Sequence, residues 1–487
     1  MIDNEIKLPP SWELCKLGHI INYGSTSKAE PLEMQPESWL LELEDIEKDT
    51  SRLITRSTVS TRKPKSTKNK FKQGQVLYGK LRPYLNKIVI ADEDGYCSTE
   101  IVPLPQCDQL DERYLFYWLK SPTFLDYTNQ VSHGINMPRL GTKAGNEAPF
   151  VVAPLAEQRR IADKLDATLA AVEACKEKLQ SATETIQRFR QSVLAAAVSG
   201  ELTREWREKR GIEEEWEFKT AKDVCSKVQS GGTPKEGFTE EGIPFLKVYN
   251  IVDQKLSFEY KPQFIDPEIH LTSMKKSRCM PGDVLMNIVG PPLGKVAITP
   301  DDHDEWNINQ AITLFRPSNE ITTEWLYILL CEGKNIREVE LSTKGSAGQK
   351  NISLTQCREF NFPCPSVEEQ QMACELVGSL FEIASTAEER INSAKEHAEK
   401  LAPAILAKAF RGELVPQDPN DEPASVLLER IKAQHEAEAA VKKPAKRGRK
   451  KKADADQLVI PKSIADNNLA KINPDAIIKV DAKFFFD

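Results

Sequence analysis

The stretch VLAAAVSGEL at residues 193–202 recurs without gaps as ILAKAFRGEL at residues 405–414. Outward from this pair, five further landmarks recur in the same order at a spacing of about 210 residues, which marks a long internal repeat. They are a Trp-led segment (11–13, 215–217), a Gly/Ser/Thr turn ending in lysine (24–28, 231–235), a strand-like run (73–83, 281–291), an aromatic helix (114–119, 325–330) and a proline-led helix start carrying Glu-Gln (154–158, 365–370). Six landmarks in one order indicate a duplicated chain, which tends to build a pseudo-two-fold structure.

A long helix is predicted in the first copy, because residues 155–198 contain no Gly or Pro. Every seventh residue belongs to one seam, made of Leu165, Val172, Leu179, Ile186 and Val193. The complementary register holds Ile161, Thr168, Cys175, Ala182, Phe189 and Ala196. A heptad seam sustained over about five heptads predicts a coiled-coil helix about 65 Å long, which Gly200 ends.

The second copy repeats this pattern before residues 405–414. Its seam consists of Val377, Ala384, Ile391, Ala398 and Ile405, and its complementary register of Leu380, Ala387, Ala394 and Leu401. We expect the two helices to pack antiparallel, because a two-fold axis should relate the copies. Pro403 predicts a kink or a restart near the end of the second helix. On pattern alone, a dimerisation or scaffold coiled coil remains an alternative.

The rest of each copy is globular, with short β-like runs broken by Gly, Pro, Asn and Asp and one or two helices between them. This pattern predicts an α+β fold. The expected architecture is therefore two α+β domains joined by two long helices that form an antiparallel coiled coil with pseudo-two-fold symmetry. The expected boundaries are 1–153 and 212–364 for the domains, 154–211 and 365–435 for the helical segments (the latter with a short following helix), and 436–487 for a basic, flexible tail.

Composition narrows the class of protein. A chain of 487 residues should form several domains. It contains no apolar run of about 18 residues and no secretion signal, so we expect a cytoplasmic protein without a membrane partner. The ten cysteines form no Cys-x-x-Cys pair, which favours free thiols over a metal site. The net charge is −7, but basic stretches occur at 62–72 and 442–452, and charge distribution matters more for nucleic-acid binding than the total.

Several of these segments resemble the specificity subunits of type I restriction-modification systems, over about residues 5–435. Residues 8–12 resemble the entry to the family's first recognition domain, and residues 230–235 with 242–247 resemble the entry to the second. Residues 154–161 are similar to the start of the first spacer helix, and residues 404–415 to the end of the second.

The resemblance implies that each globular domain is a target-recognition domain that reads half of a bipartite site on double-stranded DNA. The helix pair would set the gap between the half-sites. It also implies two methyltransferase subunits that methylate adenine, and a separate restriction subunit that translocates and cleaves DNA. S-adenosylmethionine is then expected in the methyltransferase, and no cofactor in this chain.

Candidate DNA contacts follow from the chemistry of base recognition. Arg prefers guanine, Asn and Gln prefer adenine, and cations hold phosphates. Turns between strands let such side chains project. The candidates are Lys80, Arg82, Tyr84, Lys87, His133, Asn136 and Arg139 in the first domain, and Thr233, Lys235, Lys247, Asn287, Lys295, Gln349, Lys350 and Asn351 in the second. Each could instead be a solvated surface group, and His133 and Asn136 could cap a turn.

Catalytic motifs are not found in the sequence. The nearest match to the Asn/Asp-Pro-Pro-aromatic motif of adenine methyltransferases is Gly-Pro-Pro-Leu at 290–293, which lacks both end residues. No Gly-x-Gly-x-x-Gly cofactor motif occurs, and residues 290–295 miss the P-loop spacing by one. We therefore expect a non-catalytic subunit. An enzyme with its own methylase or nuclease centre, and an adaptor without sequence-specific DNA binding, remain alternatives.

The basic tail resembles a minor-groove AT-hook at residues 442–452, but it has Lys450 where that motif has proline. A basic arm that adds salt-sensitive, sequence-independent affinity fits it better. Residues 453–487 have no assigned role.

Overall fold

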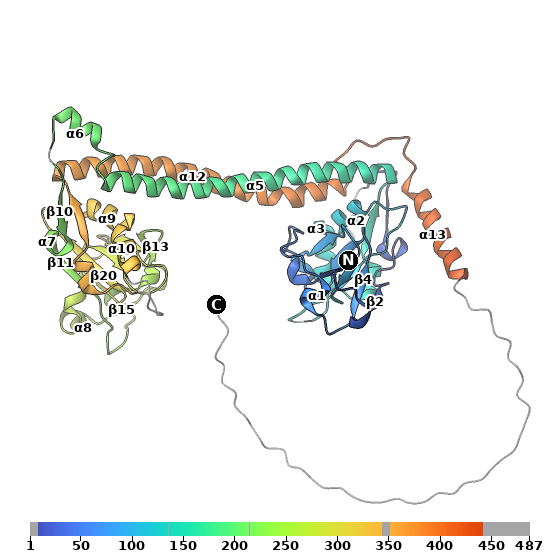
Figure 1. Cartoon of the computed structure of the whole chain (residues 1–487), viewed down its shortest axis with the longest axis horizontal. Coiled ribbons are helices and arrows are strands. Elements are labelled where there is room, and N and C mark those ends of the chain that lie inside the picture. The colour runs from blue at the N-terminus through green and yellow to red at the C-terminus, as the bar shows by residue number, and fades with distance from the viewer. Residues whose placement is uncertain (1–7, 135, 214, 343–350, 442–487) are drawn as a thin grey trace, which may run out of the picture. The chain divides into compact units, whose positions relative to one another are not determined.

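The computed structural model describes residues 8–134, 136–213, 215–342 and 351–441. The segment Met1–Lys432 forms one compact unit. Two α+β domains each pack on a pair of long helices, α5 (Leu155–Val198) and α12 (Val367–Ala409) (Figure 1). The predicted fold class is confirmed. Gln349, Lys350 and the basic stretch 442–452 lie outside the described residues.

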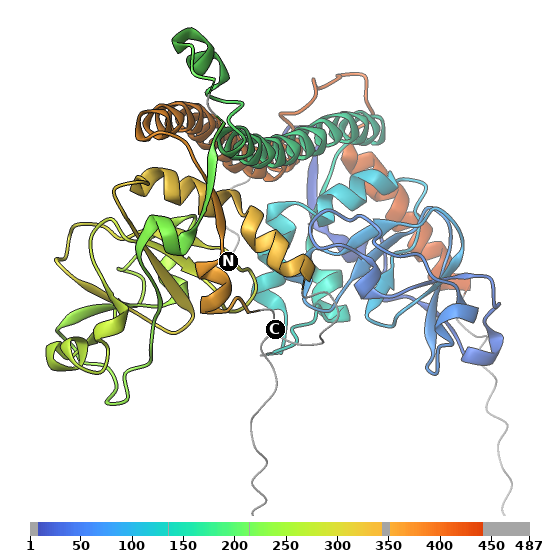
Figure 2. The same cartoon turned by 60° about the vertical axis from the view of Figure 1, so that its left-hand side comes forward.

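The two long helices run antiparallel. Figures 1 and 2 show them side by side from two directions. The side-chain contacts fix the direction: Arg190 Nη2 donates to Glu388 Oε2 at 3.1 Å, and Lys395 Nζ donates to Gln180 Oε1 at 3.2 Å. Moving from residue 180 to residue 190 along α5, the contacted residue of α12 moves back from 395 to 388, as in an antiparallel pair.

Both helices end as their shared sequence predicts. Gly200 adopts φ +80° and its N–H donates to the Ala197 carbonyl at 3.1 Å. Gly412 adopts φ +77° at the equivalent place and its N–H donates to the Ala409 carbonyl at 3.1 Å. This left-handed conformation suits glycine because glycine has no Cβ. Helix α12 runs unbroken through Pro403, so the predicted restart is wrong. The reason is packing, because Leu406 and Ala409 are buried just beyond the proline.

The main seam of each helix is confirmed, since every residue assigned to it is buried or half-buried. The complementary register of α5 is wrong at Cys175 and Phe189, which are exposed. Lys176 and Arg190, one residue further on, are half-buried instead. Arg190 lies over the Phe381 ring of α12, with its guanidinium carbon 5.0 Å from the ring centroid. The charged end of Arg190 thus takes a place in the seam by lying over an aromatic ring of the partner helix. Leu401 of α12 is exposed, which also departs from the prediction.

The first domain contains three small sheets with strand orders β2-β4-β7-β3, β6-β5-β8 and β1-β9. Its strands are β1 (Glu13–Lys16), β2 (Ser27–Ala29), β3 (Trp39–Leu41), β4 (Lys68–Phe71), β5 (Val76–Gly79), β6 (Ile88–Ile90), β7 (Gly95–Cys97), β8 (Ile101–Pro103) and β9 (Pro149–Val152). Its helices are α1 (Val59–Arg62), α2 (Glu112–Leu119), α3 (Pro122–Val131) and α4 (Thr142–Glu147).

In the second domain the described strands form sheets ordered β11-β20-β17-β18, β15-β12-β19-β16, β10-β21 and β13-β14. The parallel pair β3 and β7 of the first domain recurs here as β12 and β19. Its strands are β10 (Glu217–Thr220), β11 (Cys225–Ser230), β12 (Ile243–Leu246), β13 (Ile251–Val252), β14 (Lys255–Leu256), β15 (Phe264–Ile265), β16 (Arg278–Cys279), β17 (Val284–Asn287), β18 (Val296–Ile298), β19 (Trp306–Ile308), β20 (Ile312–Pro317) and β21 (Asn361–Cys364). The remaining helices are α6 (Arg204–Arg210), α7 (Ala221–Val224), α8 (Pro267–Leu271), α9 (Thr323–Glu332), α10 (Lys334–Ser342), α11 (Leu354–Arg358) and α13 (Ala424–Val441).

Each domain core includes both long helices. The first core takes Leu165 from the start of α5, Leu406 and Phe410 from the end of α12, and Leu427 from α13. The second core takes Val193 and two neighbours from the end of α5, and Ala373 and Val377 from the start of α12. The recurring segments 193–202 and 405–414 therefore anchor each helix end in the opposite domain.

Equivalent hydrogen bonds fix each domain to its helix start. The indole Nε1 of Trp12 donates to Glu157 Oε2 at 2.8 Å, and that of Trp216 donates to Glu369 Oε2 at 3.1 Å. Both carboxylates are buried. The Trp-led segment and the Glu-Gln helix start therefore contact each other in the same way in both copies.

Candidate nucleic-acid interface

Two loops of the first domain that are distant in sequence form one surface. The chain leaves β5 at Gly79 and makes a short turn at Pro83–Leu85, flanked by Arg82 (φ +50°) and Asn86 (φ +49°). The Arg82 N–H donates to the Pro138 carbonyl at 2.7 Å, and the Leu140 N–H donates to the Lys80 carbonyl at 3.0 Å. These bonds bring the candidates at 80–87 and 133–139 together, as a recognition surface would require.

The candidate side chains on this surface differ in their availability. Arg82, Tyr84, His133, Asn136 and Arg139 are exposed, and Lys80 and Lys87 are half-buried. Lys87 Nζ donates to the Leu43 carbonyl at 2.8 Å, so it braces the loop. Arg139 Nε pairs with Glu100 Oε2 at 3.0 Å. Within the described part of the chain, Arg82 has no side-chain hydrogen bond or ion pair, which makes it the most available cation here.

The second domain builds the equivalent junction. Val289 bridges to Asn351, as Leu81 bridges to Arg139. The Ile352 N–H donates to the Ile288 carbonyl at 2.9 Å, matching the bond from Leu140 to Lys80. The loop after β17 thus joins the segment that contains Asn351, which is exposed.

The prediction that Asn287 projects from a turn is wrong. Asn287 is the last residue of β17 and is buried. Its Nδ2 donates to the Pro292 carbonyl at 2.9 Å, and its Oδ1 accepts the Lys295 N–H at 2.6 Å. Its amide therefore braces the loop 288–294 from inside, because a buried amide must find such partners. The apolar run VLM immediately before it was the signal for an inward position.

The remaining candidates of the second domain lie on three segments: Thr233 and Lys235 between β11 and β12, Lys247 just after β12, and Lys295 just before β18. Thr233 and Lys235 are exposed, and Lys247 and Lys295 are half-buried. Thr233 Oγ1 donates to Gln310 Oε1 at 3.3 Å. Gln310 adjoins Ala311, whose carbonyl accepts the N–H of Ile288 at 2.8 Å. The loop of Thr233 is thus connected through residues 309–311 to the loop after β17.

The two surfaces differ in charge. At equivalent backbone positions, the first domain carries Lys80, Arg82 and Arg139, where the second carries Ile288, Gly290 and Asn351. The second domain places its cations at Lys235 and Lys247 instead. An exposed aromatic residue, Phe238, lies beside them and was missed by sequence reasoning. The glycine-rich turn before it, 231–237, was the available signal.

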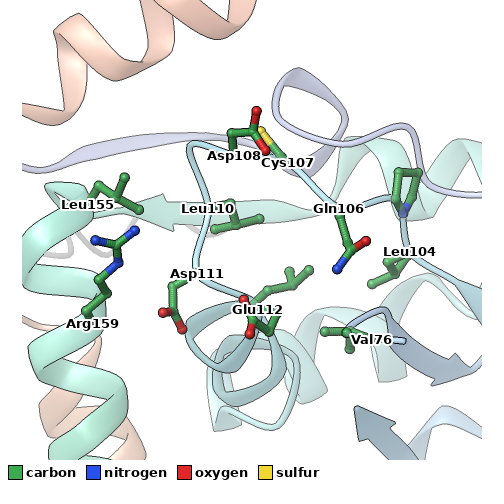
Figure 3. A pocket seen from close by; sticks show the side chains of 13 residues that line it. Val76, Leu104, Gln106, Cys107, Asp108, Leu110, Asp111, Glu112, Leu155 and Arg159 are labelled. Atoms are coloured by element: carbon green, nitrogen blue, oxygen red, sulfur yellow. The ribbon is translucent and has the colours of Figure 1, made fainter. Parts of the chain in front are cut away.

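A separate pocket of about 380 Å³ lies beside the start of α5 (Figure 3). Its lining includes Asp111, Glu112 and Arg159 over an apolar floor. Asp111 already caps α2, since its Oδ1 accepts the N–H groups of Arg113 and Tyr114 at 3.0 and 3.1 Å. The position of this carboxylate is therefore explained by helix capping.

A larger cavity of about 700 Å³ lies between α2, α3 and the two long helices and holds the Lys120 side chain. Lys120 Nζ donates to Ser51 Oγ at 2.8 Å. Burial lowers the pKa of Lys120 from 10.5 to about 8. Between these values the unfolded chain binds more protons than the folded one, so this lysine makes stability rise with pH. Below pH 8 Lys120 is charged in both the folded and the unfolded chain, so the full cost of burying its charge lowers the free energy of unfolding.

We therefore expect Lys120→Met to raise the thermal unfolding midpoint relative to the wild type at pH 7, and this gain to shrink as the pH rises toward 10. Unfolding followed at pH 7, 8, 9 and 10 checks this. Lys178→Met, at an exposed lysine of α5, corrects for the general loss of one positive charge. An advantage of Lys120→Met that is the same at pH 7 and pH 10 would contradict the expectation.

No helix in the described ranges is both long and apolar enough to cross a lipid bilayer.

The fold defines a class of protein: two equivalent α+β domains lie on an antiparallel helix pair, and each domain carries a pair of loops joined by a β-bridge. Residues 9–184 and 213–396 match the family model of the type I restriction modification DNA specificity domain. The chain therefore belongs to this family, and the resemblance drawn from its sequence is confirmed.

Relatives that align with about 70% of the chain are named specificity subunits of type I restriction enzymes. The chain is 29% identical over 372 residues to the type I restriction enzyme EcoBI specificity subunit of Escherichia coli, covering 71% of this chain and 76% of that one. It is 29% identical over 353 residues to the StySPI specificity subunit of Salmonella potsdam, covering 70% and 75%. The predicted role as a DNA specificity subunit is thus confirmed.

A solved structure supports the fold independently. A chain from a study of complex assembly and conformational transition of the type I system superposes with a TM-score of 0.69 at 21% identity. The match covers 84% of this chain and 99% of that one.

Proposed function

We propose that this specificity subunit binds a bipartite site on double-stranded DNA, with one domain on each half-site and the helix pair between them. The proposed target-recognition domains are residues 1–153 and 212–364. One observation carries the proposal: the same bridged loop junction occurs in both domains, at Leu81–Arg139 and Val289–Asn351. A dimer-like protein reads half-sites whose spacing follows its own geometry.

We also propose that the subunit is non-catalytic and works in the cytoplasm within a larger complex. Two methyltransferase subunits would use S-adenosylmethionine to methylate adenine, and restriction subunits would translocate and cleave DNA. The names of the relatives, which are specificity subunits of restriction enzymes, support this assignment. The two-fold repeat supports two copies of one partner, because equivalent surfaces bind equivalent partners.

The test is to express this chain alone, the partner methyltransferase alone and the two together, and to map methylated adenines across the host genome. We expect one motif of two half-sites with a fixed gap, which disappears when the chain is omitted. A mobility-shift assay of the assembled complex should show preference for that motif over random duplexes. Binding without preference would support the adaptor alternative, and methylation by the isolated chain would support the enzyme alternative.

Arg82 provides a sharper test of the first domain. Arg82→Asn should weaken specific binding by about 1–3 kcal/mol and relax the preference at one base pair, if the guanidinium contacts a guanine. Asn is chosen because it tolerates the left-handed backbone at φ +50°. Binding of duplexes with each half-site position varied measures both effects. Arg204→Asn, on α6, is the control, because its guanidinium already pairs with Glu201. An unchanged preference at every position would remove Arg82 from the base-reading set.

A further inference from the structure

Phe238 is exposed on the loop between β11 and β12 of the second domain, the loop that also carries Thr233 and Lys235. Phe238 is 44% exposed. Single exposed apolar residues are common and need no explanation, but this one has an ordered environment. Its ring lies 5.3 Å from that of Phe245, which is buried, and Lys247 Nζ lies 4.4 Å from its centroid. One side of the ring is thus packed, while a large part of its surface remains open to solvent.

The loop that carries Phe238 is anchored on both sides. On one side, the Gly232 N–H donates to the Ile308 carbonyl at 3.1 Å. On the other, the Thr239 N–H donates to the Phe264 carbonyl at 2.9 Å. Between them, Gly237 adopts φ +92° with nothing within 4 Å of where its Cβ would be. The backbone therefore presents Phe238 at a fixed place beside an open, glycine-formed turn.

This loop belongs to the same edge as the bridged junction. The Asn309 N–H donates to the Leu246 carbonyl at 3.0 Å, immediately before Lys247, and Thr233 contacts the neighbouring Gln310. Residues 309–311 in turn hold Ile288 at the start of the loop after β17. A duplex bound at that junction would therefore lie along the edge that carries Phe238.

Charge alone does not suit this loop for binding phosphates. Lys235 is exposed, but so are Glu236, Glu240 and Glu241. The loop has no surplus of cations to attract the DNA backbone. A partly exposed aromatic ring, with a lysine over it, is suited instead to stacking on a base where the bound protein opens a step of the duplex.

We propose that Phe238 stacks on a base at an opened step of the second half-site and so completes a recognition surface whose described junction residues, Ile288, Gly290 and Asn351, carry no cation. This inference rests on the proposed DNA-binding function. It makes Phe238 a base-contacting residue whose contribution to affinity does not depend on salt, because stacking releases no counterions.

The experiment uses the assembled complex with its methyltransferase subunits and a duplex of its own methylation motif. Phe238→Ala should lower specific affinity about tenfold, within the range for losing one stacked base, and should leave the slope of log affinity against log salt unchanged. Phe238→Trp should retain affinity within about twofold, whereas Phe238→Leu should lose nearly as much as Ala, because only an aromatic ring supplies a stacking face. Quenching of 2-aminopurine, placed in turn at each adenine position of the second half-site, should decrease in Phe238→Ala at one position.

Phe218→Ala is the matched control, because Phe218 is a more exposed phenylalanine of the same domain on β10. Its complex should bind DNA as the wild type does. Equal affinity of Phe238→Ala and the wild type, full affinity of Phe238→Leu, or a reduced salt slope in Phe238→Ala would each overturn the stacking proposal. Failure of the wild-type complex to prefer its motif would instead overturn the proposed function, so the two failures are distinguishable.

Discussion

Seven residues inserted into both α5 and α12 should lengthen the gap in the methylated motif while leaving both half-sites unchanged. At 1.5 Å rise per residue, a heptad adds about 10 Å to each helix, and DNA rises about 3.4 Å per base pair. The gap should therefore grow by up to about 3 base pairs. The insertions belong after Gln180 and before Lys395, which contact each other across the pair. A whole heptad in both helices preserves the seam.

Two variants control for general disruption. A heptad in α5 alone shifts the seam on one side only, and it should abolish methylation. Seven residues added to the connection 415–423, outside the helix pair, should leave the gap as it is. Genome-wide mapping of methylated adenines measures all three. An unchanged gap in the double-insertion variant would show that the helices do not set the spacing.

Phe410→Ala should destabilise the first domain by about 3–5 kcal/mol, the cost of emptying a large buried aromatic site. The ring is 4% exposed, and its centroid lies 5.2 Å from that of Tyr114 and 5.0 Å from that of Trp118. Because Phe410 follows α12, its loss should also loosen the attachment of that helix end to the domain. Hydrogen exchange of the amides in β5 and β8 should report the loss as reduced protection.

Phe189→Ala is the comparison, since Phe189 is 39% exposed on α5. It should change protection in the first domain by less than about 0.5 kcal/mol, as exposed substitutions usually do. Equal effects of the two substitutions would show that the contact between the α12 end and the first domain contributes little.

The sequence predicted the long helices well, because the signals that end and align them are local. Gly200 and Gly412 need a left-handed backbone, and the main seam follows a strict heptad. The complementary seam was harder to predict. A rule based on apolar residues selects Cys175 and Phe189, whereas the structure half-buries Lys176 and Arg190 instead, with the Arg190 guanidinium over Phe381. Only the partner helix determines that choice.

The recognition surface was predicted in part. Turn position and polarity identified Arg82 and Asn351 as exposed loop residues. Turn position and polarity do not distinguish a side chain that projects from the end of a strand from one that points inward. For this reason Asn287 was predicted to be exposed, whereas it is buried. Phe238 was missed because an isolated aromatic in a sequence is most often part of a core. Its exposure results from the path of a loop, which depends on contacts with residues about 70 positions away, at Ile308 and Asn309.

Because each domain core includes residues from both long helices, translation determines when each core can be completed. The amino-terminal domain cannot complete its interior until Leu406, Phe410 and Leu427 have been translated. At about 5–20 residues per second, that delay is on the order of tens of seconds after its own strands leave the ribosome. During that interval its unfinished apolar surface is open to aggregation. The core of the carboxy-terminal domain, among the described residues, includes none beyond Phe381. The domain made first is therefore the one that finishes last, and it is the one that most needs a chaperone during translation.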